Sequence, residues 1–238
     1  MRGTRNKKWI VRLGALFLCA AGAQAAVDLG IDVLAEHDYS LLKGRRVGLI
    51  TNQTGINSTG TKTRLLLKRH CNLVALYTPE HGLDGTEKAG HYVKSRRDRL
   101  TGVMAYSLYG PTRKPTPAML RGIDVLVFDL QDIGCRSYTY ISTMGRCMEA
   151  AGENKIPFVV LDRPNPVGGL RIEGPSVEPR WRSFVSEFPI PYVHGLTVGE
   201  LARMVNGRQW ISTPCDLTVV QMHGWHRGMT WEIGRAHV

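Results

Sequence analysis

The sequence lacks the short motifs that mark several large enzyme classes. It contains no Gly-x-Ser-x-Gly elbow and no His-Glu-x-x-His segment, which argues against serine esterases and zinc peptidases. It also contains no P-loop and no Gly-x-Gly-x-x-Gly, so classical nucleotide-binding enzymes are disfavoured. Two classes remain: an enzyme whose chemistry is carried by carboxylates, and a binding protein without catalysis.

Cysteine is scarce, with five residues in 238. Cys19 lies in the apolar N-terminal segment, and the other four show neither CxxC spacing nor a neighbouring histidine pattern; they are Cys71, Cys135, Cys147 and Cys215. We therefore expect no zinc site, no other metal and no cofactor. In an exported protein four cysteines allow three pairings, among which the sequence does not choose, and buried free thiols fit equally well.

No apolar run reaches the roughly 20 residues of a membrane-spanning helix. The apolar run over 13–23 follows four basic residues within the first eight positions and ends at Ala23-Gln24-Ala25. A basic start, a short apolar stretch and a small-x-small site are typical of a secretory signal peptide. We expect residues 1–25 to be removed, the protein to be exported to the periplasm or beyond, and no stable membrane insertion to remain.

Acidic residues are outnumbered, with 20 Asp and Glu against 31 Lys and Arg. The N-terminal segment holds five of the 31 basic residues and no acid, so the rest of the chain carries a net charge of +6 rather than +11. This excess is dispersed and is not interleaved with aromatic residues, which argues against nucleic acid as a partner. An anionic polymer of the cell wall would suit such a surface.

Short apolar runs rich in Val, Ile and Leu predict strands covered on both faces. They lie at 47–51, 73–77, 103–106, 123–130 and 158–161. Helices are expected between them at 61–70, 116–121 and 139–153, and a capping-box pattern opens a further helix over 197–205. Alternating strands and helices predict an α/β fold with a doubly wound, mainly parallel sheet. The Pro- and Gly-rich stretch 163–195 reads as a long excursion from that sheet.

Polar side chains follow four of these runs, where each predicted strand ends. Asn52 follows the first run, and Glu80 and His81 follow the second. The runs ending at 130 and 161 lead into two further polar loops. Since the carboxyl ends of parallel strands share one edge, we expect these loops to form one ligand-binding crevice.

Glu80 and His81 stand between Pro79 and Gly82, in a loop that is stiff on one side and permissive on the other. A carboxyl group held there, partly out of water, can have a raised pKa and donate a proton. The structural alternatives are that Glu80 caps a helix or pairs with a lysine and that His81 only supports the loop. Glu87 is a possible second carboxylate, although solvent exposure fits it as well.

The loop after 130 gathers an amide, a carboxylate, a guanidinium and a phenol within eight residues: Gln131, Asp132, Arg136 and Tyr138. Asp132 could act as a base, as a nucleophile or as the group that orients a substrate amide, whereas Tyr138 could stack on a sugar ring. The alternative is that Asp132 caps the helix expected from Thr139, through Arg136.

The loop after 161 presents Arg163 and Asn165 between two X-Pro steps, which hold the backbone extended. Asn165 would suit a substrate hydroxyl and Arg163 a substrate carboxylate. An equally good reading is a structural network between Asp162 and Arg163.

Seven segments together resemble a known family, the exo-β-N-acetylmuramidases of bacterial cell-wall recycling, formerly a domain of unknown function. The likeness runs from about Val27 to Glu232. The segments are Leu49-Ile-Thr-Asn-Gln-Thr-Gly55, Thr78-Pro-Glu-His-Gly82, Tyr106-Ser-Leu-Tyr-Gly110, Phe128-Asp-Leu-Gln-Asp-Ile-Gly134, Tyr138-Thr-Tyr140, Leu161-Asp-Arg-Pro-Asn-Pro166 and His194-Gly-Leu-Thr-Val-Gly-Glu-Leu-Ala202.

The resemblance implies a Rossmann-like N-terminal catalytic domain, a smaller C-terminal domain and an active site between them. It assigns 26–196 to the first domain and 197–232 to the start of a truncated second one. Residues 233–238 resemble the translation of a sequencing adapter and are expected to be foreign.

The implied activity is that of a secreted glycoside hydrolase that removes terminal N-acetylmuramic acid from the non-reducing end of peptidoglycan fragments. Glu80 would be the catalytic acid and Asp132 a second catalytic group, and Asp132 or Glu87 would orient and polarise the sugar's acetamido group. Asn52, His81, Gln131, Tyr138 and Asn165 would contact the substrate, and Arg163 or Arg136 would pair with the lactyl carboxylate. The alternative is a non-catalytic periplasmic protein that binds muropeptides or sugars.

Overall fold

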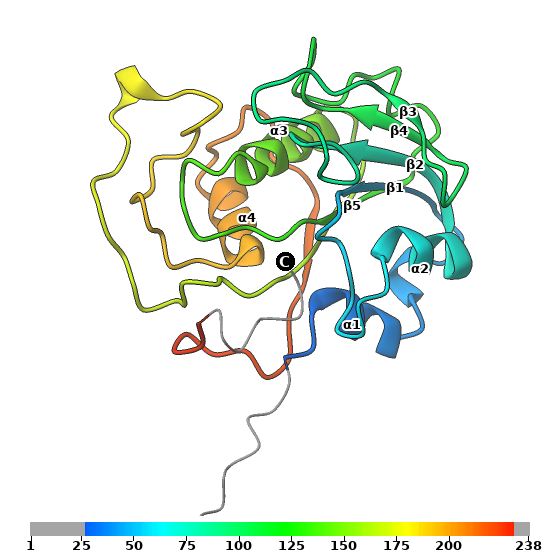
Figure 1. Cartoon of the computed structure of the whole chain (residues 1–238), viewed down its shortest axis with the longest axis horizontal. Helices are drawn as coiled ribbons and strands as arrows, with labels where there is room; N and C mark the ends of the chain where they lie inside the picture. Colours follow the sequence, from blue (N-terminus) through cyan, green and yellow to red (C-terminus); the bar gives the residue numbers. More distant parts are fainter. Residues whose placement is uncertain (1–26, 231–238) are drawn as a thin grey trace, which may run out of the picture.

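The computed structural model describes residues 27–230 (Figure 1). The predicted signal peptide and the tail at 233–238 lie outside the described residues. The described chain forms a seven-stranded sheet in which β3 alone runs antiparallel to its neighbour. In spatial order the strands are β3 (Arg96–Arg97), β4 (Met104–Ser107), β2 (Asn72–Thr78), β1 (Arg46–Thr51), β5 (Val125–Asp129), β6 (Phe158–Leu161) and β7 (Leu217–Val220).

Helices cover both faces of this sheet, as Figure 1 shows. α1 (Gly30–Glu36) and α2 (Thr63–His70) pack on one face, whereas α3 (Tyr140–Glu153) and α4 (Val198–Gly207) pack on the other. Successive side chains of β5 point to opposite faces of the sheet. Leu126 and Phe128 belong to the core on the α3 and α4 face, and Val125 and Val127 belong to the core on the α1 and α2 face. Two short 3-10 helices complete the structure, η1 (Ser40–Leu42) and η2 (Pro179–Trp181).

The strand order places a topological switch at the centre of the sheet. From β1 the chain moves outward through β2 to β4, and then returns to the other side of β1 and moves outward through β5, β6 and β7. Loops at the carboxyl ends of β1 and β5 therefore diverge, and such a switch point is where open α/β sheets bind ligands. The predicted doubly wound, mainly parallel α/β fold is confirmed.

One predicted helix is wrong. Residues 117–122 form turns rather than a helix. One helix-type bond forms, from the Leu120 amide to the Thr116 carbonyl, but Gly122 adopts a φ of 80°, which ends the turn and reverses the chain immediately before β5. The expected excursion at 163–195 is present, with η2 as its one helical turn, and it extends to one side of the sheet (Figure 1, yellow).

The segment after residue 196 packs on the same sheet. The predicted capping box is present, since Thr197 accepts a bond from the Glu200 amide and the Glu200 carboxylate accepts one from the Thr197 amide. α4 then packs on α3, and β7 pairs with β6. The domain boundary at 196 stays a prediction, but the elements that follow it share this core.

Two further properties follow from the described region. Among residues 27–230, no helix is long and apolar enough to cross a membrane. The four cysteines of this region are free, and burial raises the pKa of Cys71 to about 11 and that of Cys215 to about 12. The thiols of Cys71 and Cys215 are therefore poor nucleophiles at neutral pH.

Candidate functional site

Five loops at the carboxyl edge of the sheet form what we call the strand-end site. They follow β1, β2, β4, β5 and β6 and carry most of the polar residues that the sequence singled out. Hydrogen bonds tie these loops to one another. Thr54, after β1, accepts a bond from the Gln131 amide after β5 at 3.0 Å, and the Gln131 side chain donates to the Pro164 carbonyl after β6 at 2.8 Å.

Glu80 lies two residues after β2, and its carboxylate accepts two hydrogen bonds. Its Oε1 accepts from the Gly90 amide at 2.8 Å, and its Oε2 accepts from the Thr139 hydroxyl at 2.9 Å, at the start of α3. Burial by itself would raise the pKa of Glu80, but these bonds and the nearby Tyr109 hydroxyl outweigh it and hold the pKa below its usual value. The direction is opposite to the raised pKa that the sequence suggested.

His81 supports the loop that carries Glu80. Its backbone φ is 68°, and its Nδ1 lies 2.9 Å from the Glu87 carbonyl oxygen within the same loop. Glu87 itself is exposed. His81 therefore fixes the loop geometry while its ring remains only half-buried.

Asn52 is 2% exposed and connects the loop after β1 to α3. Its amide donates to the Tyr140 hydroxyl at 2.8 Å, and its Oδ1 accepts from the Thr54 amide at the same distance. The Tyr140 ring in turn lies 4.5 Å from that of Tyr138, at an interplanar angle of 57°. Asn52 thus positions the pair of tyrosines.

Tyr138 is within electrostatic reach of both carboxylates predicted to be catalytic. Burial raises its pKa, a bond with the Tyr140 side chain lowers it, and the negative charges of Asp132 and Glu80 raise it further. The structure therefore brings Glu80, Asp132 and Tyr138 into one group.

Asp132 is buried next to a histidine that was not assigned from the sequence. The Oδ2 of Asp132 accepts from the Gly134 amide at 2.7 Å and lies 3.3 Å from Nε2 of His194. The Nδ1 of His194 accepts from the Leu196 amide, so the proton of the neutral ring is on Nε2, facing Asp132. The other oxygen of Asp132, Oδ1, is buried and has no partner within residues 27–230. The expected capping of α3 by Asp132 is not observed.

Arg163 and Arg136 are engaged with the protein itself. Arg163 is fully buried and donates from Nε and Nη2 to both oxygens of Asp129, at 2.6 and 3.0 Å. Arg136 donates from Nη1 to the carbonyl oxygens of Pro175 and Ile190, which anchors the excursion. Both guanidinium groups therefore hold the site together. The structural role that the sequence allowed for Arg163 is present, but its guanidinium group pairs with Asp129 and not with Asp162.

Asn165 is also engaged in backbone bonds. Its Nδ2 donates to the Leu196 carbonyl at 2.9 Å, and its Oδ1 accepts from the Val167 amide at 3.0 Å. It therefore joins the loop after β6 to the segment that carries His194.

The structure adds three residues to the strand-end site: His194, Tyr109 and Arg113. His194 and Tyr109 belong to segments that carried the family resemblance, but only Tyr109 lies close to a strand end. Tyr109 follows β4, and Arg113 lies four residues further on. The end of the apolar run at 103–106 was the sequence pattern that could have pointed to Tyr109 and Arg113 as site residues.

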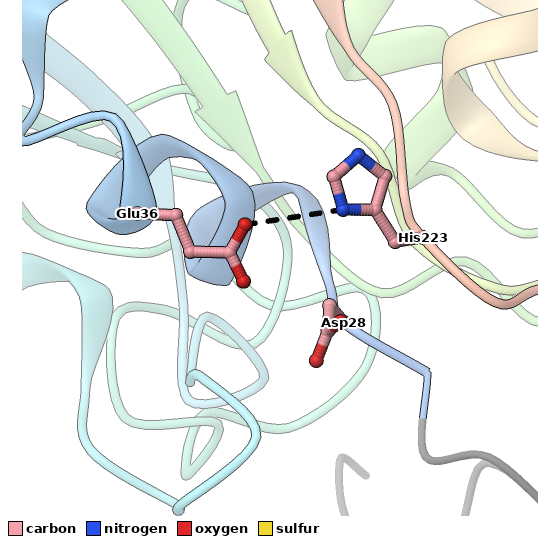
Figure 2. A group of neighbouring side chains, drawn as sticks. All are labelled: Asp28, Glu36 and His223. Carbon is pink, nitrogen blue, oxygen red and sulfur yellow. Dashed lines mark ion pairs between the residues drawn. The ribbon is translucent and has the colours of Figure 1, made fainter.

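A separate group of side chains could offer ligands to a metal ion. Asp28, Glu36 and His223 each place one ligand atom within 4.8 Å of the others. Figure 2 shows Glu36 and His223 facing each other across an ion pair of 3.9 Å, with Asp28 nearby. A backbone bridge between Asp28 and His223 accounts for their proximity. The side chains of Glu36 and His223 are more than half exposed, and the group lies outside the strand-end site.

The fold and the site define an α/β protein in which loops at the switch point gather two carboxylates, two tyrosines and a histidine. This combination fits a protein that acts on a polar ligand such as a saccharide. The chain matches the family described as Exo-beta-N-acetylmuramidase NamZ, N-terminal, over residues 47–237, and it belongs to that family.

Curated and solved relatives agree with this assignment. The chain is 51% identical over 208 residues to the peptidoglycan beta-N-acetylmuramidase NamZ of Bacillus subtilis (strain 168), a match that covers 87% of this chain and 50% of that protein. A crystal structure of a DUF1343 family protein from Bacteroides fragilis NCTC 9343 is 56% identical with a TM-score of 0.82, covering 87% of this chain and 53% of that one. A second, from the same organism, is 36% identical with a TM-score of 0.75, covering 86% and 54%. The chain thus spans about half the length of these relatives.

Proposed function

We propose that the full-length protein containing this chain is an exo-acting β-N-acetylmuramidase, which releases terminal N-acetylmuramic acid from the non-reducing end of peptidoglycan fragments. One observation carries the proposal: Glu80 is fixed at the carboxyl edge of the sheet, beside Tyr138 and the buried Asp132, in a chain of the NamZ family. The curated relative is named for the same activity.

In the proposed reaction, Glu80 donates its proton to the glycosidic oxygen. The bond between C1 and that oxygen breaks, its electrons stay with the leaving sugar, and the carbonyl oxygen of the substrate's own acetamido group bonds to C1. Asp132 accepts the acetamido N–H through its unpartnered Oδ1, which increases the electron density on the attacking oxygen. Water then opens the cyclic intermediate and gives its proton to the Glu80 carboxylate. Such substrate-assisted hydrolysis is an established variant among glycosidases of 2-acetamido sugars.

We also propose export to the periplasm or the cell exterior. The basic start, the short apolar run and the Ala23-Gln24-Ala25 site support it. Peptidoglycan lies outside the cytoplasmic membrane, so an exported enzyme would meet its proposed substrate there. Expression with and without residues 1–25, followed by cell fractionation, tests this, since retention of the complete chain in the cytoplasm would contradict it.

The activity is tested on the full-length protein with a chromogenic β-N-acetylmuramide and the matching β-N-acetylglucosaminide. We expect release from the muramide, and we expect Glu80→Gln to abolish it without changing the thermal unfolding temperature. Glu178→Gln, at an exposed glutamate on the excursion, is the matched control and should retain activity. Binding of N-acetylmuramic acid without release from either substrate would favour the alternative, a non-catalytic sugar-binding protein.

A further inference from the structure

Arg113 contacts two aromatic rings at the rim of the strand-end site, and these rings also contact each other, with centroids 6.3 Å apart and a tilt of 52°. Its guanidinium carbon lies 4.4 Å from the centroid of the Tyr109 ring and 4.3 Å from that of Phe184. Tyr109 belongs to the loop after β4 and Phe184 to the excursion, so two distant segments fix one exposed guanidinium group. Cation–π contact with two rings restricts where the guanidinium group can lie and leaves N–H donors for a ligand.

The guanidinium group borders a small pocket. The pocket has a volume of about 210 Å³ and is lined by Gly90, Tyr92, Tyr109, Gly110 and Arg113. The Tyr92 ring lies directly against Gly110, where any Cβ atom would overlap it, and the side chain remains 54% exposed. An exposed aromatic ring beside a charged, planar donor suits a ligand with both an apolar ring face and a carboxylate.

This pocket adjoins the proposed proton donor. The amide of Gly90 donates to Glu80, and the Tyr109 hydroxyl interacts with both Glu80 and Arg113. The amide of Val93 donates to the Tyr109 carbonyl at 3.0 Å, which joins the two loops that form the pocket. A sugar whose glycosidic oxygen meets Glu80 would therefore have its own substituents near Arg113.

Arg113 is also the arginine of the site that keeps its charge available. Arg163 is paired with Asp129, and Arg136 is bound to backbone carbonyls. Within residues 27–230, Arg113 has no carboxylate within ion-pair distance. Arg113 thus supplies the cation that a muramic acid carboxylate requires, in place of Arg163 or Arg136, which were expected from the sequence.

We propose that Arg113, held by cation–π contacts with Tyr109 and Phe184, binds the lactyl carboxylate of N-acetylmuramic acid and so discriminates it from N-acetylglucosamine. The inference rests on the proposed function, because it assigns the recognition step of the same site. A planar guanidinium group offers a carboxylate two parallel N–H donors. N-acetylglucosamine has a hydroxyl where muramic acid has the lactyl ether, so it would leave this charge unpaired.

The first test measures equilibrium binding to the chain by isothermal titration calorimetry. The probes are N-acetylmuramic acid, its lactyl methyl ester and N-acetylglucosamine. We expect the free acid to bind about 10- to 100-fold more tightly than the other two, as a charge-assisted pair implies. Arg113→Met should bind all three equally, whereas Arg113→Lys should recover part of the preference because it keeps the charge without the planar fork.

Arg180→Met is the matched control. Arg180 also stacks on an aromatic ring of the excursion, that of Trp181, at 5.3 Å, but it does not line this pocket. It should keep the full preference for the free acid. The inference is overturned if Arg113→Met retains the wild-type preference, or if the wild-type chain does not distinguish the acid from its methyl ester.

The second test separates this inference from the proposed function. In the full-length protein, kcat/KM for the chromogenic muramide is measured for the wild type and for Arg113→Met. Hydrolysis with unchanged kcat/KM in Arg113→Met refutes the role of Arg113 and leaves the function intact. Carboxylate binding that depends on Arg113, in a wild type that hydrolyses neither substrate, refutes the function and supports the inference.

Discussion

The buried carboxyl group of Asp162 makes the stability of this fold depend on pH in a direction that can be measured. Asp162 follows β6 and is 6% exposed. Burial raises its pKa from 3.8 to about 6, although its Oδ1 accepts from the amides of Arg163 and Gly199 and its Oδ2 from the Thr197 hydroxyl. Ionised Asp162 therefore lowers the stability of the folded state relative to the unfolded chain.

The size of the effect follows from the two pKa values. Because the folded pKa is the higher one, the contribution of Asp162 is fully favourable below pH 3.8 and is lost as the pH rises through about 6. A difference of this size corresponds to about 3 kcal/mol in full, of which about 2 kcal/mol falls between pH 4 and pH 7.5.

The perturbation is Asp162→Asn, which keeps the shape of the side chain and removes the charge. The new Oδ1 can accept from the two amides, and the new Nδ2 can donate to the Thr197 hydroxyl. Urea unfolding at several pH values measures the free energy of unfolding of both proteins. The difference between the variant and the wild type should grow in favour of the variant by about 2 kcal/mol from pH 4 to pH 7.5, which corresponds to about 1 M in the urea concentration at the unfolding midpoint.

Asp216→Asn, at an exposed aspartate just before β7, is the matched control and should differ from the wild type by a nearly constant amount. A difference between Asp162→Asn and the wild type that stays constant from pH 4 to pH 7.5 would refute the reasoning. It would mean that the three hydrogen bonds fully offset the burial of the carboxylate.

Two further predictions concern packing and charge. Gly30→Ala in α1 would bring a methyl group within 2.8 Å of the Leu161 backbone, so it should destabilise the fold by about 1–3 kcal/mol. Gly207→Ala, at the end of α4, meets nothing within 4 Å and should be neutral or stabilise the fold by about 0.5 kcal/mol. Thermal unfolding of the two variants checks both expectations. Arg163→Met leaves Asp129 buried and unpaired and should cost about 3–5 kcal/mol in urea unfolding, and the double variant with Asp129→Leu should recover much of this loss.

The central strands could be predicted because their sequence signal is strong. Runs such as 158–161 are continuously apolar, since helices cover both faces, and a polar residue follows each run directly. β7 gave a weaker signal, because it is a half-exposed edge strand of four residues. α1 has seven residues and no polar N-cap side chain, since Leu29 occupies that position. Short elements of this kind are specified by the packing around them.

The residues of the strand-end site were predictable only where they follow a strand. Glu80 and Asp132 were found in this way, whereas His194 reaches Asp132 from a loop more than 60 residues later in the sequence. The roles of the arginines depended on contacts that no local pattern records. Arg163 and Arg136 have the right charge and the right loops, but Asp129 and two carbonyl oxygens occupy them.

The lowered pKa of Glu80 sets a condition on the proposed mechanism, because a proton donor must be protonated when the glycosidic bond breaks. Burial is the influence that raises this pKa, and the bonds from Gly90 and Thr139, together with the nearby Tyr109 hydroxyl, lower it. A sugar seated over Glu80 would increase its burial and shift the balance toward the protonated form. We therefore expect the pKa of Glu80 to be higher in the ligand complex than in the free protein.

Removing one of these donors tests this balance directly. Thr139→Val deletes the hydroxyl that bonds to Oε2 of Glu80 at 2.9 Å, so the pKa of Glu80 should rise; Thr139→Ser keeps the hydroxyl and is the matched control. Since kcat/KM is lost above the pKa of the essential acid in the free enzyme, its alkaline limb should move to higher pH in Thr139→Val and stay in place in Thr139→Ser. An alkaline limb that stays in place in both variants would show that a group other than Glu80 supplies the proton, and it would remove Glu80 from that role even if Glu80→Gln were inactive.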